Sequence, residues 1–480
     1  MGLSKKFELE KYHTSFYNEL LAGVTTFFTM SYIIFVNPAI MAETGMPYEG
    51  AFAATVIATV IGTLLMALVA NVPYAMAPGM GTNSFVTYTI CLGLNYHWRE
   101  AMAIVFLSGV IHFVLNITGF RRPFVNAIPK SFKYATASGI GLFISYIGIK
   151  NAGLLSFIIN NGQYTWLNSG MIIGNSSAVP SLVGVFSQTQ LIAVIGLLVI
   201  IFLMTLEKKT GESYSALLMG ILVATFVGVP LNVTNISEIT PFDLSPLFSI
   251  KDVAFSFFGN PGLLSLFESP SKILTSILMI AIVTLTCVVD SVSTIIGISL
   301  EEHPIFDEED YDRFANTKGI TSRLDKTLVV DSTSGIISSL TGTTTTTTYI
   351  ESVAGISSGG RTGLTALVVA ALFLICLPFS GLFAIIPSAA IAPALIVAGI
   401  YLIPMLKNVD WSELEDAVSA SLVILFIPLT NSIINGVAIG YIAYILICLT
   451  LGKHHKIHPF LYVISAVFIA VISLRAFINI

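Results

Sequence analysis

Long, continuously apolar runs recur along the whole of this 480-residue chain, and they constrain its fold more than any other feature. The runs 190–206 and 365–377 are examples, each with few polar side chains. Such runs are typical of membrane-spanning helices, because a helix satisfies its own backbone hydrogen bonds where no water is available. Strands of a membrane barrel would instead alternate apolar and polar residues over short segments. We therefore predict an all-α, polytopic membrane protein.

The composition agrees with this class. Hydrophobic residues make up 55% of the chain and charged residues only 10%, whereas a soluble domain of this size needs far more charge on its surface. The four cysteines lie in or beside apolar segments and are interpreted as small hydrophobic residues. No disulfide framework, metal site or cofactor is expected. The polar start, residues 1–15, precedes an apolar stretch without a cleavage site, so no signal peptide is predicted.

Apolar segments bounded by turn residues predict about fourteen membrane spans. They are 18–36, 51–70, 75–93, 101–118, 134–149, 190–206, 214–230, 273–299, 327–341, 343–357, 364–379, 383–404, 416–431 and 435–451. A further apolar segment, 459–474, is expected to pack on the bundle or to lie in the membrane interface.

The distribution of basic residues sets the predicted orientation. With the N-terminus in the cytoplasm, only Arg99, Lys150, Lys251 and Lys272 fall in outer loops, and the other lysines and arginines up to Lys456 fall in inner loops. An excess of basic residues on the cytoplasmic side is what the positive-inside rule requires. Both ends of the fourteen-span core should face the cytoplasm, and the expected location is the plasma membrane.

Two spans would make poor lipid-facing helices. Segment 73–88 (PYAMAPGMGTNSFVTY) contains two prolines and two glycines, and segment 342–349 (GTTTTTTY) contains six consecutive threonines. Proline and glycine weaken helices, and β-branched threonine favours extended backbone. Irregular backbone at membrane depth survives where protein buries it or where it lines a cavity, as in the broken helices of transporters. The alternative is a pair of kinked packing helices whose hydroxyls bond to their own turns.

Three acidic residues lie beyond the first turn of a predicted span. Asp290 and Glu351 are expected to be functional, because a charged acid in the membrane is costly. For Asp331, near the inner face, a structural hydrogen bond is an equally good interpretation. No basic residue lies in the middle of any span, so Asp290 and Glu351 are expected to bind a donor-rich ligand or a proton.

Several long motifs resemble the azaguanine-resistance-type purine permeases, a branch of the nucleobase/ascorbate transporter superfamily. The likeness extends from about Ser15 to Leu461. The motifs are AGVTTFFTMSYIIFVNPAI (22–40), APGMGTNSFVTYT (77–89), SGIGLFISYIGIKNAG (138–153), VDSVSTIIGIS (289–299) and TTTTYIESVAGISSGGRTGLTA (345–366).

The resemblance implies two inverted seven-helix repeats that form a core and a gate domain, with short strands in the third and tenth spans. The implied divisions are a cytoplasmic N-terminus (1–15), core (16–118 and 272–380), gate (119–271 and 381–452) and a C-terminal segment (453–480). The implied activity is uptake of adenine, guanine, hypoxanthine or xanthine by proton symport. The expected partners are the base, the coupling ion and the lipid bilayer. A homodimer is one assembly that the chain could form, and no nucleic acid is expected to bind.

The resemblance also assigns site residues. Asp290 and Glu351 match the family's two membrane acids, which would hold the base and carry the proton. A carboxylate suits this role because charge-assisted hydrogen bonds from purine N–H groups are about twice as strong as neutral ones. Phe85 and Tyr349 stand where ring or backbone contacts to the base would fall, and the amide of Asn83 is able to discriminate ring edges.

The chain departs from the family pattern at two positions. Ser293 stands where the family usually has glycine, and Cys287 stands where an additional aspartate is frequent. Ser293 lies one turn from Asp290 on the same helix face and would crowd the base or add a hydroxyl contact. These departures leave the purine preference and the coupling ion open. Thr294 is a further hydroxyl beside the site, and with Ser291 and Asp290 it would suit sodium instead of a proton.

Other functions fit the sequence less well than purine transport does. The nearest is a related carrier for another nucleobase or for a small heterocyclic or anionic solute. An enzyme is disfavoured because no nucleophile–base pair or metal motif is present, and the glycine-rich stretch 355–363 lacks phosphate-loop spacing. A channel would need a visible pore repeat or selectivity filter.

Overall fold

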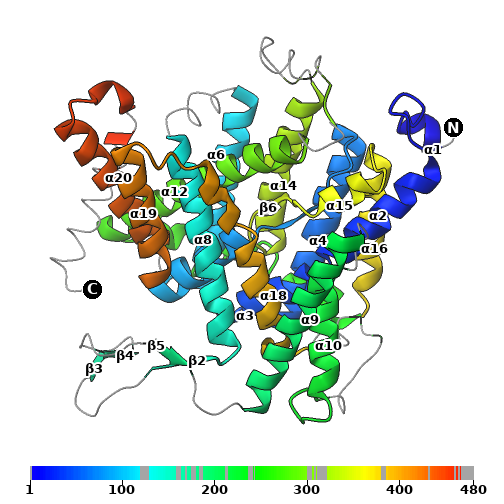
Figure 1. The fold of residues 1–480 in the computed structure, drawn as a ribbon, viewed down its shortest axis with the longest axis horizontal. Coiled ribbons are helices and arrows are strands. Elements are labelled where there is room, and N and C mark those ends of the chain that lie inside the picture. Colours follow the sequence, from blue (N-terminus) through cyan, green and yellow to red (C-terminus); the bar gives the residue numbers. More distant parts are fainter. Residues whose placement is uncertain are drawn as a thin grey trace.

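The computed structural model is mainly helical (Figure 1). It describes residues 3–118, 129–157, 164–167, 170–173, 180–182, 187–210, 215–235, 242, 244–299, 305–307, 310, 320, 322–379, 385–430, 433–458, 461–462 and 465. The predicted interfacial helix at 459–474 lies mostly outside these residues.

One group of helices packs around α4 and α14. In this first group, α14 lies against α4 and α6, α16 packs on α2 and α4, and α12 packs on α6. The members are α2 (Phe16–Met30), α3 (Ile33–Ala42), α4 (Tyr48–Leu65), α5 (Met80–Ser84), α6 (Trp98–Thr118), α12 (Pro270–Ser299), α14 (Arg323–Thr341), α15 (Ser352–Ser357) and α16 (Gly363–Cys376). Helix α4 continues as a π-helical turn, η1 (Met66–Ala70), and α5 continues as η2 (Phe85–Gly93).

Helix α14 begins and ends at residues suited to those positions. Ser322 and Asp325 form a capping box, in which the hydroxyl of Ser322 accepts from the Asp325 amide at 3.0 Å. Gly342 ends the helix with a φ of 96°, a left-handed conformation that glycine adopts without strain. The chain therefore leaves α14 directly into the threonine run.

The first predicted span is interrupted. The sequence predicted one continuous helix over 18–36, but α2 ends at Met30 and α3 begins at Ile33. At the break, the Ser31 hydroxyl donates to the carbonyl oxygen of Phe28 at 3.1 Å and so competes with the regular helical pattern. The break places Tyr32 between two helices.

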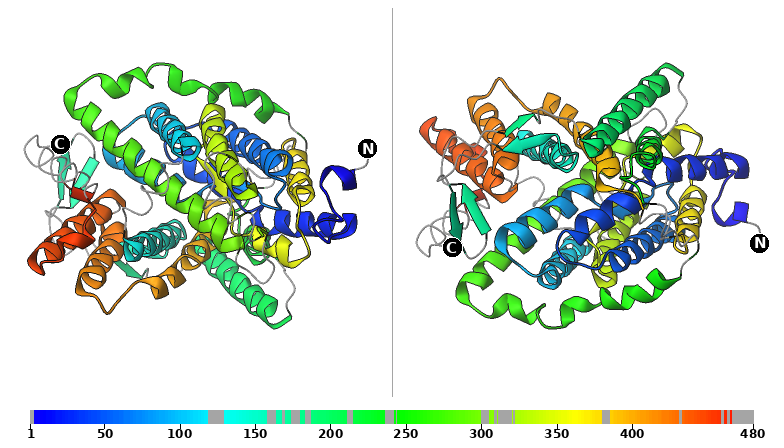
Figure 2. Two further views of the ribbon diagram at one scale, coloured as in Figure 1. Left: turned by 90° about the horizontal axis from the view of Figure 1, so that it is seen from above. Right: turned by 90° about the horizontal axis from the view of Figure 1, so that it is seen from below.

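A second group of helices surrounds α8. In this group, α8 packs on α18 and α19, α19 on α20, and α9 on α10 and α18. The members are α8 (Lys130–Asn151), α9 (Gln188–Thr210), α10 (Ala216–Gly228), α18 (Ser388–Ile400), α19 (Leu414–Leu429) and α20 (Ile433–Thr450). Figure 2 shows orange and red α19 and α20 on the side of the molecule opposite the blue N-terminal helices.

Helices α8 and α18 approach each other closely at a pair of glycines. A Cβ atom at Gly399 would lie 2.2 Å from the carbonyl oxygen of Gly141 and 2.3 Å from the hydroxyl of Ser145. The Ser145 hydroxyl also donates to the carbonyl oxygen of Ile396 at 2.9 Å. Small residues at such a crossing let two backbones come close together, as in many membrane helix pairs.

Short helical turns around residues 245–267 pack on the first group. They contact α4, α6 and α12. The resemblance assigned residues 119–271 to the gate domain, and that division stays a prediction. The turns are α11 (Ser245–Ser249), η3 (Ile250–Asp252), η4 (Ser256–Phe258) and η5 (Leu264–Phe267).

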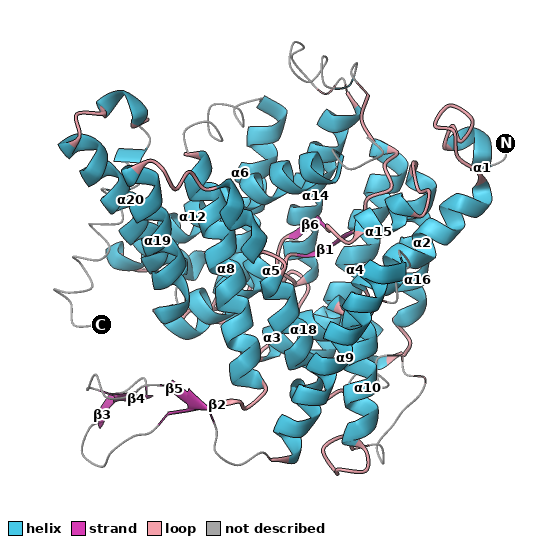
Figure 3. Cartoon of the chain, in the orientation of Figure 1, coloured by secondary structure: helices cyan, strands magenta, loops and turns pink. Residues whose placement is uncertain are grey.

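Three two-stranded antiparallel sheets are present in the described residues. Strands β1 (Met76–Pro78) and β6 (Thr346–Thr348) pair at the centre of the helices. The other two pairs, which Figure 3 shows outside the helical body, belong to one connection. They are β2 (Leu155–Phe157) with β5 (Pro180–Leu182), and β3 (Tyr164–Leu167) with β4 (Gly170–Ile173).

Six helical stretches in the described part of the chain are long and apolar enough to cross a membrane. They are Phe16–Ala42, Tyr48–Ala70, Trp98–Thr118, Gln188–Thr210, Pro270–Val288 and Ser388–Asn408. Three shorter apolar helices accompany them: Ala216–Gly228, Gly363–Cys376 and Gly436–Thr450. The chain is thus a multi-pass membrane protein, and the count of fourteen spans stays a prediction.

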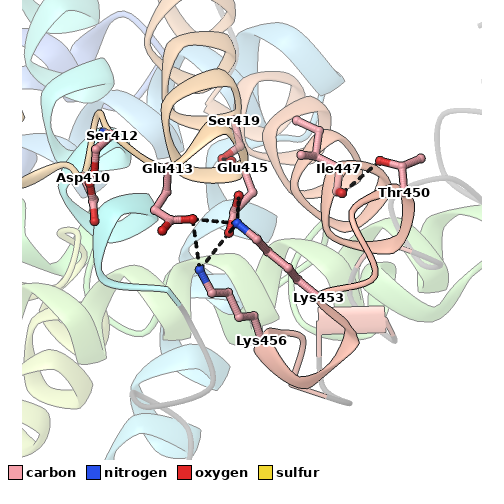
Figure 4. A network of polar contacts seen from close by, with 9 residues as sticks. All are labelled: Asp410, Ser412, Glu413, Glu415, Ser419, Ile447, Thr450, Lys453 and Lys456. Atoms are coloured by element: carbon pink, nitrogen blue, oxygen red, sulfur yellow. Dashed lines mark hydrogen bonds and ion pairs between the residues drawn. The ribbon is translucent and has the colours of Figure 1, made fainter.

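An ion-pair cluster joins the start of α19 to η7 (His454–Lys456), the turn after α20 (Figure 4). Lys453 Nζ lies 2.6 Å from Glu413 Oε2 and 2.8 Å from Glu415 Oε1, and Lys456 Nζ lies 2.8 Å from the same Glu415 oxygen. Burial opposes the charge of Glu415, but the hydrogen bonds from the two lysines outweigh it and lower the pKa of this carboxyl to about 2. The cluster therefore holds the start of α19 and the turn after α20 together, just before the predicted span 416–431 begins.

Candidate functional site

The candidate site is built around the β1–β6 pair. Met76 pairs with Thr348, Ala77 with Thr347 and Pro78 with Thr346. Backbone bonds extend the pairing at both ends, from Gly79 N to Thr345 O at 3.0 Å and from Tyr349 N to Ala75 O at 2.9 Å. Each strand then leads into a short helix, α5 or α15. Extended backbone at the centre of a helical membrane protein is therefore satisfied by pairing with itself.

Asp331 on α14 anchors strand β6. Its Oδ1 accepts from both the amide and the hydroxyl of Thr348, each at 3.0 Å, and its Oδ2 accepts from the Ser291 hydroxyl of α12. Asp331 is only 1% exposed. The sequence left this residue open between a structural and a functional role, and the observed bonds make it a positioning residue for β6.

Asn83 lies in a buried amide–hydroxyl network. Its Nδ2 donates to the Oδ1 of Asn37, and its Oδ1 accepts from the hydroxyl of Thr344. Asn37 in turn donates to the hydroxyls of Thr55 at 2.6 Å and Thr343 at 2.9 Å. The network ties α5, α3 and α4 to the threonine run.

Asn37 was not among the residues that the sequence singled out. The sequence feature that could have pointed to it is an asparagine inside an otherwise apolar stretch, IIFVNPAIMA. A buried amide at such a position requires hydrogen-bond partners. Its partners are distant in sequence, so no local pattern reveals them.

Glu351 lies between β6 and α15, and its carboxylate is held by Tyr32. The Tyr32 hydroxyl donates to Glu351 Oε1 at 2.6 Å from the break between α2 and α3. Tyr349 is buried, and its hydroxyl donates to the carbonyl oxygen of Pro78 at 2.7 Å.

The remaining predicted residues lie on two helices. Asp290 and Thr294 are half-buried on α12, and the carboxylates of Asp290 and Asp331 repel each other. The side chain of Ser293 lies outside the described part of the structure. Phe85 is buried at the start of η2, directly after α5.

Two acids thus lie on segments next to the same strand, since α12 contacts β6 and Glu351 follows it. Asp290 is adjacent to Ser291, which bonds to the Asp331 that anchors Thr348, and Glu351 follows Thr348 by three residues. The interactions of the described residues do not join Asp290 to Glu351 directly, so their convergence on one ligand stays a prediction. No ion pair within the described ranges involves either acid.

Two elements that follow strand β1 in the candidate site border the second group of helices. Helix α5 contacts α8, and η2 contacts α20. A ring such as that of Phe85 on η2 and a carboxylate such as that of Glu351 suit a ligand with an aromatic face and N–H donors.

Comparison with known proteins shows which family the chain belongs to. Residues 17–439 match a family described as the "Permease family". A putative permease of Methanocaldococcus jannaschii is 35% identical over 471 residues, which cover 97% of each chain. The guanine/hypoxanthine permease PbuO of Bacillus subtilis is 34% identical over 96% of this chain and 98% of its own. The adenine permease AdeP of Escherichia coli is 31% identical over 97% of this chain and 95% of its own.

Solved structures agree on the fold. The transmembrane domain of a cyanobacterium bicarbonate transporter, BicA, superimposes with a TM-score of 0.58 at 18% identity over 88% of this chain and 96% of that one. Murine Solute Carrier 26 family member A9, an anion transporter, gives a TM-score of 0.58 at 14% identity over 90% of this chain and 68% of that one. The fold is that of a helical membrane transporter, and the chain belongs to the permease family, in the branch of its purine-permease relatives.

Proposed function

We propose that this protein is a secondary active transporter that takes up purine nucleobases. Membership of the permease family makes it a transporter and not an enzyme. Relatives over nearly the whole chain are guanine/hypoxanthine and adenine permeases, which supports a purine as the solute. The observation that carries the proposal is Glu351, an acid held by Tyr32 beside the central strand pair.

In the proposed binding mode, Glu351 and Asp290 accept N–H donors of the base. Phe85 and Tyr349 contact the ring of the base. The amide of Asn83, which is held by its bond to Asn37, forms a hydrogen bond with the edge of the base. Hydroxyls of Ser293 and Thr294 would line the side of the pocket formed by α12. In this arrangement Asp331 does not touch the base but keeps Thr348 and its strand in place.

The two helix groups suggest how the base would cross the membrane. In this proposal the first group is the core domain, which holds the site, and the second group is the gate domain. Support comes from the contacts, which are extensive inside each group and sparse between them. Rocking of one group against the other would expose the site to each side in turn. We further propose fourteen spans in two inverted repeats, a cytoplasmic N-terminus, residence in the plasma membrane and a homodimer as the assembly.

The proposed coupling ion is the proton. A proton bound to Asp290 or Glu351 would reduce repulsion between the two acids and let one of them donate to an acceptor atom of the base. Release of proton and base into the cytoplasm would follow opening of the inner gate. Sodium is the alternative, with Asp290, Ser291 and Thr294 as oxygen ligands.

Uptake by proteoliposomes tests the function. Purified protein should accumulate radiolabelled hypoxanthine, guanine or adenine saturably, and an unlabelled purine should compete. An imposed inward pH gradient should drive the accumulation, whereas an inward sodium gradient at constant pH should not. Accumulation driven only by sodium would replace the proton in this scheme. Failure to take up any purine, together with uptake of another solute, would assign the site to a different heterocyclic or anionic substrate.

A further inference from the structure

Glu19 is a buried acid that the proposed binding mode does not use. It lies in the first turn of α2, and its side chain is fully buried. Its Oε1 accepts from the amides of Arg361 at 2.9 Å and Thr362 at 3.2 Å. Its Oε2 accepts from Thr365, from the amide at 3.0 Å and from the hydroxyl at 2.6 Å. These donors lie in the turn between α15 and α16 and at the start of α16, so one carboxylate holds this connection against α2.

The turn that Glu19 holds also closes the end of α15. The guanidinium of Arg361 donates through Nη1 to the carbonyl oxygens of Ile356 and Gly360, each at 2.6 Å. The amide of Gly360 donates to the carbonyl oxygen of Gly355 at 3.0 Å. Since Gly355 and Ile356 belong to α15, this helix and the turn after it form one hydrogen-bonded unit. A displacement of the turn would therefore displace α15 as well.

Helix α15 lies against α2 from end to end. At its beginning, the Tyr32 hydroxyl donates to Glu351 Oε1 at 2.6 Å, and at its far end the turn is bonded to Glu19. Between them, Gly355 is so close to α2 that a Cβ atom there would lie 2.7 Å from the carbonyl oxygen of Ala22. A helix of six residues is too short to be stable without tertiary packing, so α2 determines where α15 lies.

We infer that Glu19 is a positioning residue for the proposed substrate acid, because it holds α15 along α2 and thereby keeps Glu351 beside Tyr32. This inference rests on the proposed function. Glu19 itself does not touch the base, since its carboxylate is enclosed by the connection at the other end of α2. Its contribution to binding should therefore depend on the bond between Tyr32 and Glu351.

Glu19→Gln tests the inference through uptake of radiolabelled hypoxanthine by proteoliposomes prepared from the monodisperse fraction. The glutamine amide keeps one acceptor oxygen, but its NH2 group meets N–H or O–H donors where the second carboxylate oxygen accepted. Helix α15 then loses its fixed place on α2, so the KM should rise at least about threefold. The kcat should change less than the KM, as expected when ground-state binding is lost. A lower kcat with an unchanged KM would overturn the inference.

Tyr32→Phe provides the decisive comparison. If Glu19 acts through the contact between Tyr32 and Glu351, both substitutions weaken the same contact. The rise in KM of the double variant should then be smaller than the product of the two single rises. Rises that multiply would show that Glu19 only caps α16, and would overturn the inference. Thr29→Val is the control and should leave the KM unchanged, because the Thr29 hydroxyl donates to carbonyl oxygens within α2.

Thr365→Val keeps the inference testable if Glu19→Gln does not fold. This isosteric substitution removes one hydroxyl donor to Glu19 and leaves the amide donors in place. The KM should rise about two- to threefold, and this rise should disappear in the Tyr32→Phe background. An unchanged KM, or a rise that persists in that background, would overturn the inference, while saturable purine uptake by the wild type still upholds the proposed function. Absence of purine uptake by the wild type would overturn both.

Discussion

The carboxylate of Asp331 accepts two hydrogen bonds from Thr348, one from its amide and one from its hydroxyl, each at 3.0 Å. Since Asp331 also accepts from Ser291, this single side chain joins α14, β6 and α12. Thr348 lies three residues before Glu351, so the bonds from Thr348 to Asp331 fix the strand that leads to this proposed substrate-binding acid.

Asp331→Ala should abolish uptake. The substitution leaves the buried amide of Thr348 without its partner, which costs about 1–3 kcal/mol, and it frees the strand that precedes Glu351. Asp331→Asn should be milder, because the amide oxygen still accepts from Thr348. Uptake and detergent thermal stability are measured together, with Ser332→Ala as a control whose hydroxyl bonds only within its own helix. Normal uptake by Asp331→Ala would show that β6 needs no anchor.

Glu351→Gln should lose purine binding while the protein stays folded. The neutral amide still accepts from Tyr32, but it binds an N–H donor of the base about half as strongly as a carboxylate does. Binding is measured with radiolabelled base on purified protein. Glu268→Gln, which changes a glutamate whose side chain is 62% exposed between η5 and α12, is the control. Wild-type affinity in Glu351→Gln would remove Glu351 from the site.

Thr344→Val and Thr346→Val should differ, although both replace a threonine of the same run by an isosteric residue. The Thr344 hydroxyl donates to Asn83, so its loss should raise the KM and lower the unfolding temperature. The buried Thr346 hydroxyl has no partner within the described residues, so its removal should be neutral or slightly stabilising. The KM for uptake and the unfolding temperature are measured for both variants and for the wild type. Equal effects would mean that the run acts only through its extended backbone.

The Glu415 cluster should stabilise the protein equally across physiological pH. The folded-state pKa of Glu415 is lowered to about 2, so its stabilisation is complete above the usual glutamate pKa of about 4.3 and is lost as pH falls through 2. The pKa of Lys456 is raised, mainly by its bond to Glu415, so the cationic partner is retained until pH rises above its usual range near 10.5. The cluster therefore cannot produce a pH dependence of transport between pH 5 and 9.

Glu415→Gln tests this expectation. Its unfolding temperature in detergent should lie at least about 2 °C below that of the wild type, by the same margin at pH 5, 7 and 9. The margin should narrow below pH 4.3. Glu8→Gln, which removes an exposed partner of Lys11, should change little. A margin that varies between pH 5 and 9 would contradict the assignment.

Some features of the protein follow from the sequence alone. Continuous apolar runs determine that the chain is a helical membrane protein, because backbone groups in a bilayer must be satisfied within a helix. The Pro-Gly segment at 73–88 and the threonine run at 342–349 mark where regular helix fails, since both oppose helical backbone locally. The acids Asp290 and Glu351 stand out for the same kind of reason, as isolated charges in apolar surroundings.

Other features exist only in the tertiary structure. The pairing of Met76 with Thr348 joins residues from distant parts of the chain, and neither segment specifies its partner. The roles of Asp331, Asn37 and Tyr32 depend on hydrogen bonds across the helix bundle, and Tyr32 and Glu351 are 319 positions apart. Local propensity and periodicity report how each segment prefers to fold, whereas a buried polar group is defined by the partner that packing brings to it.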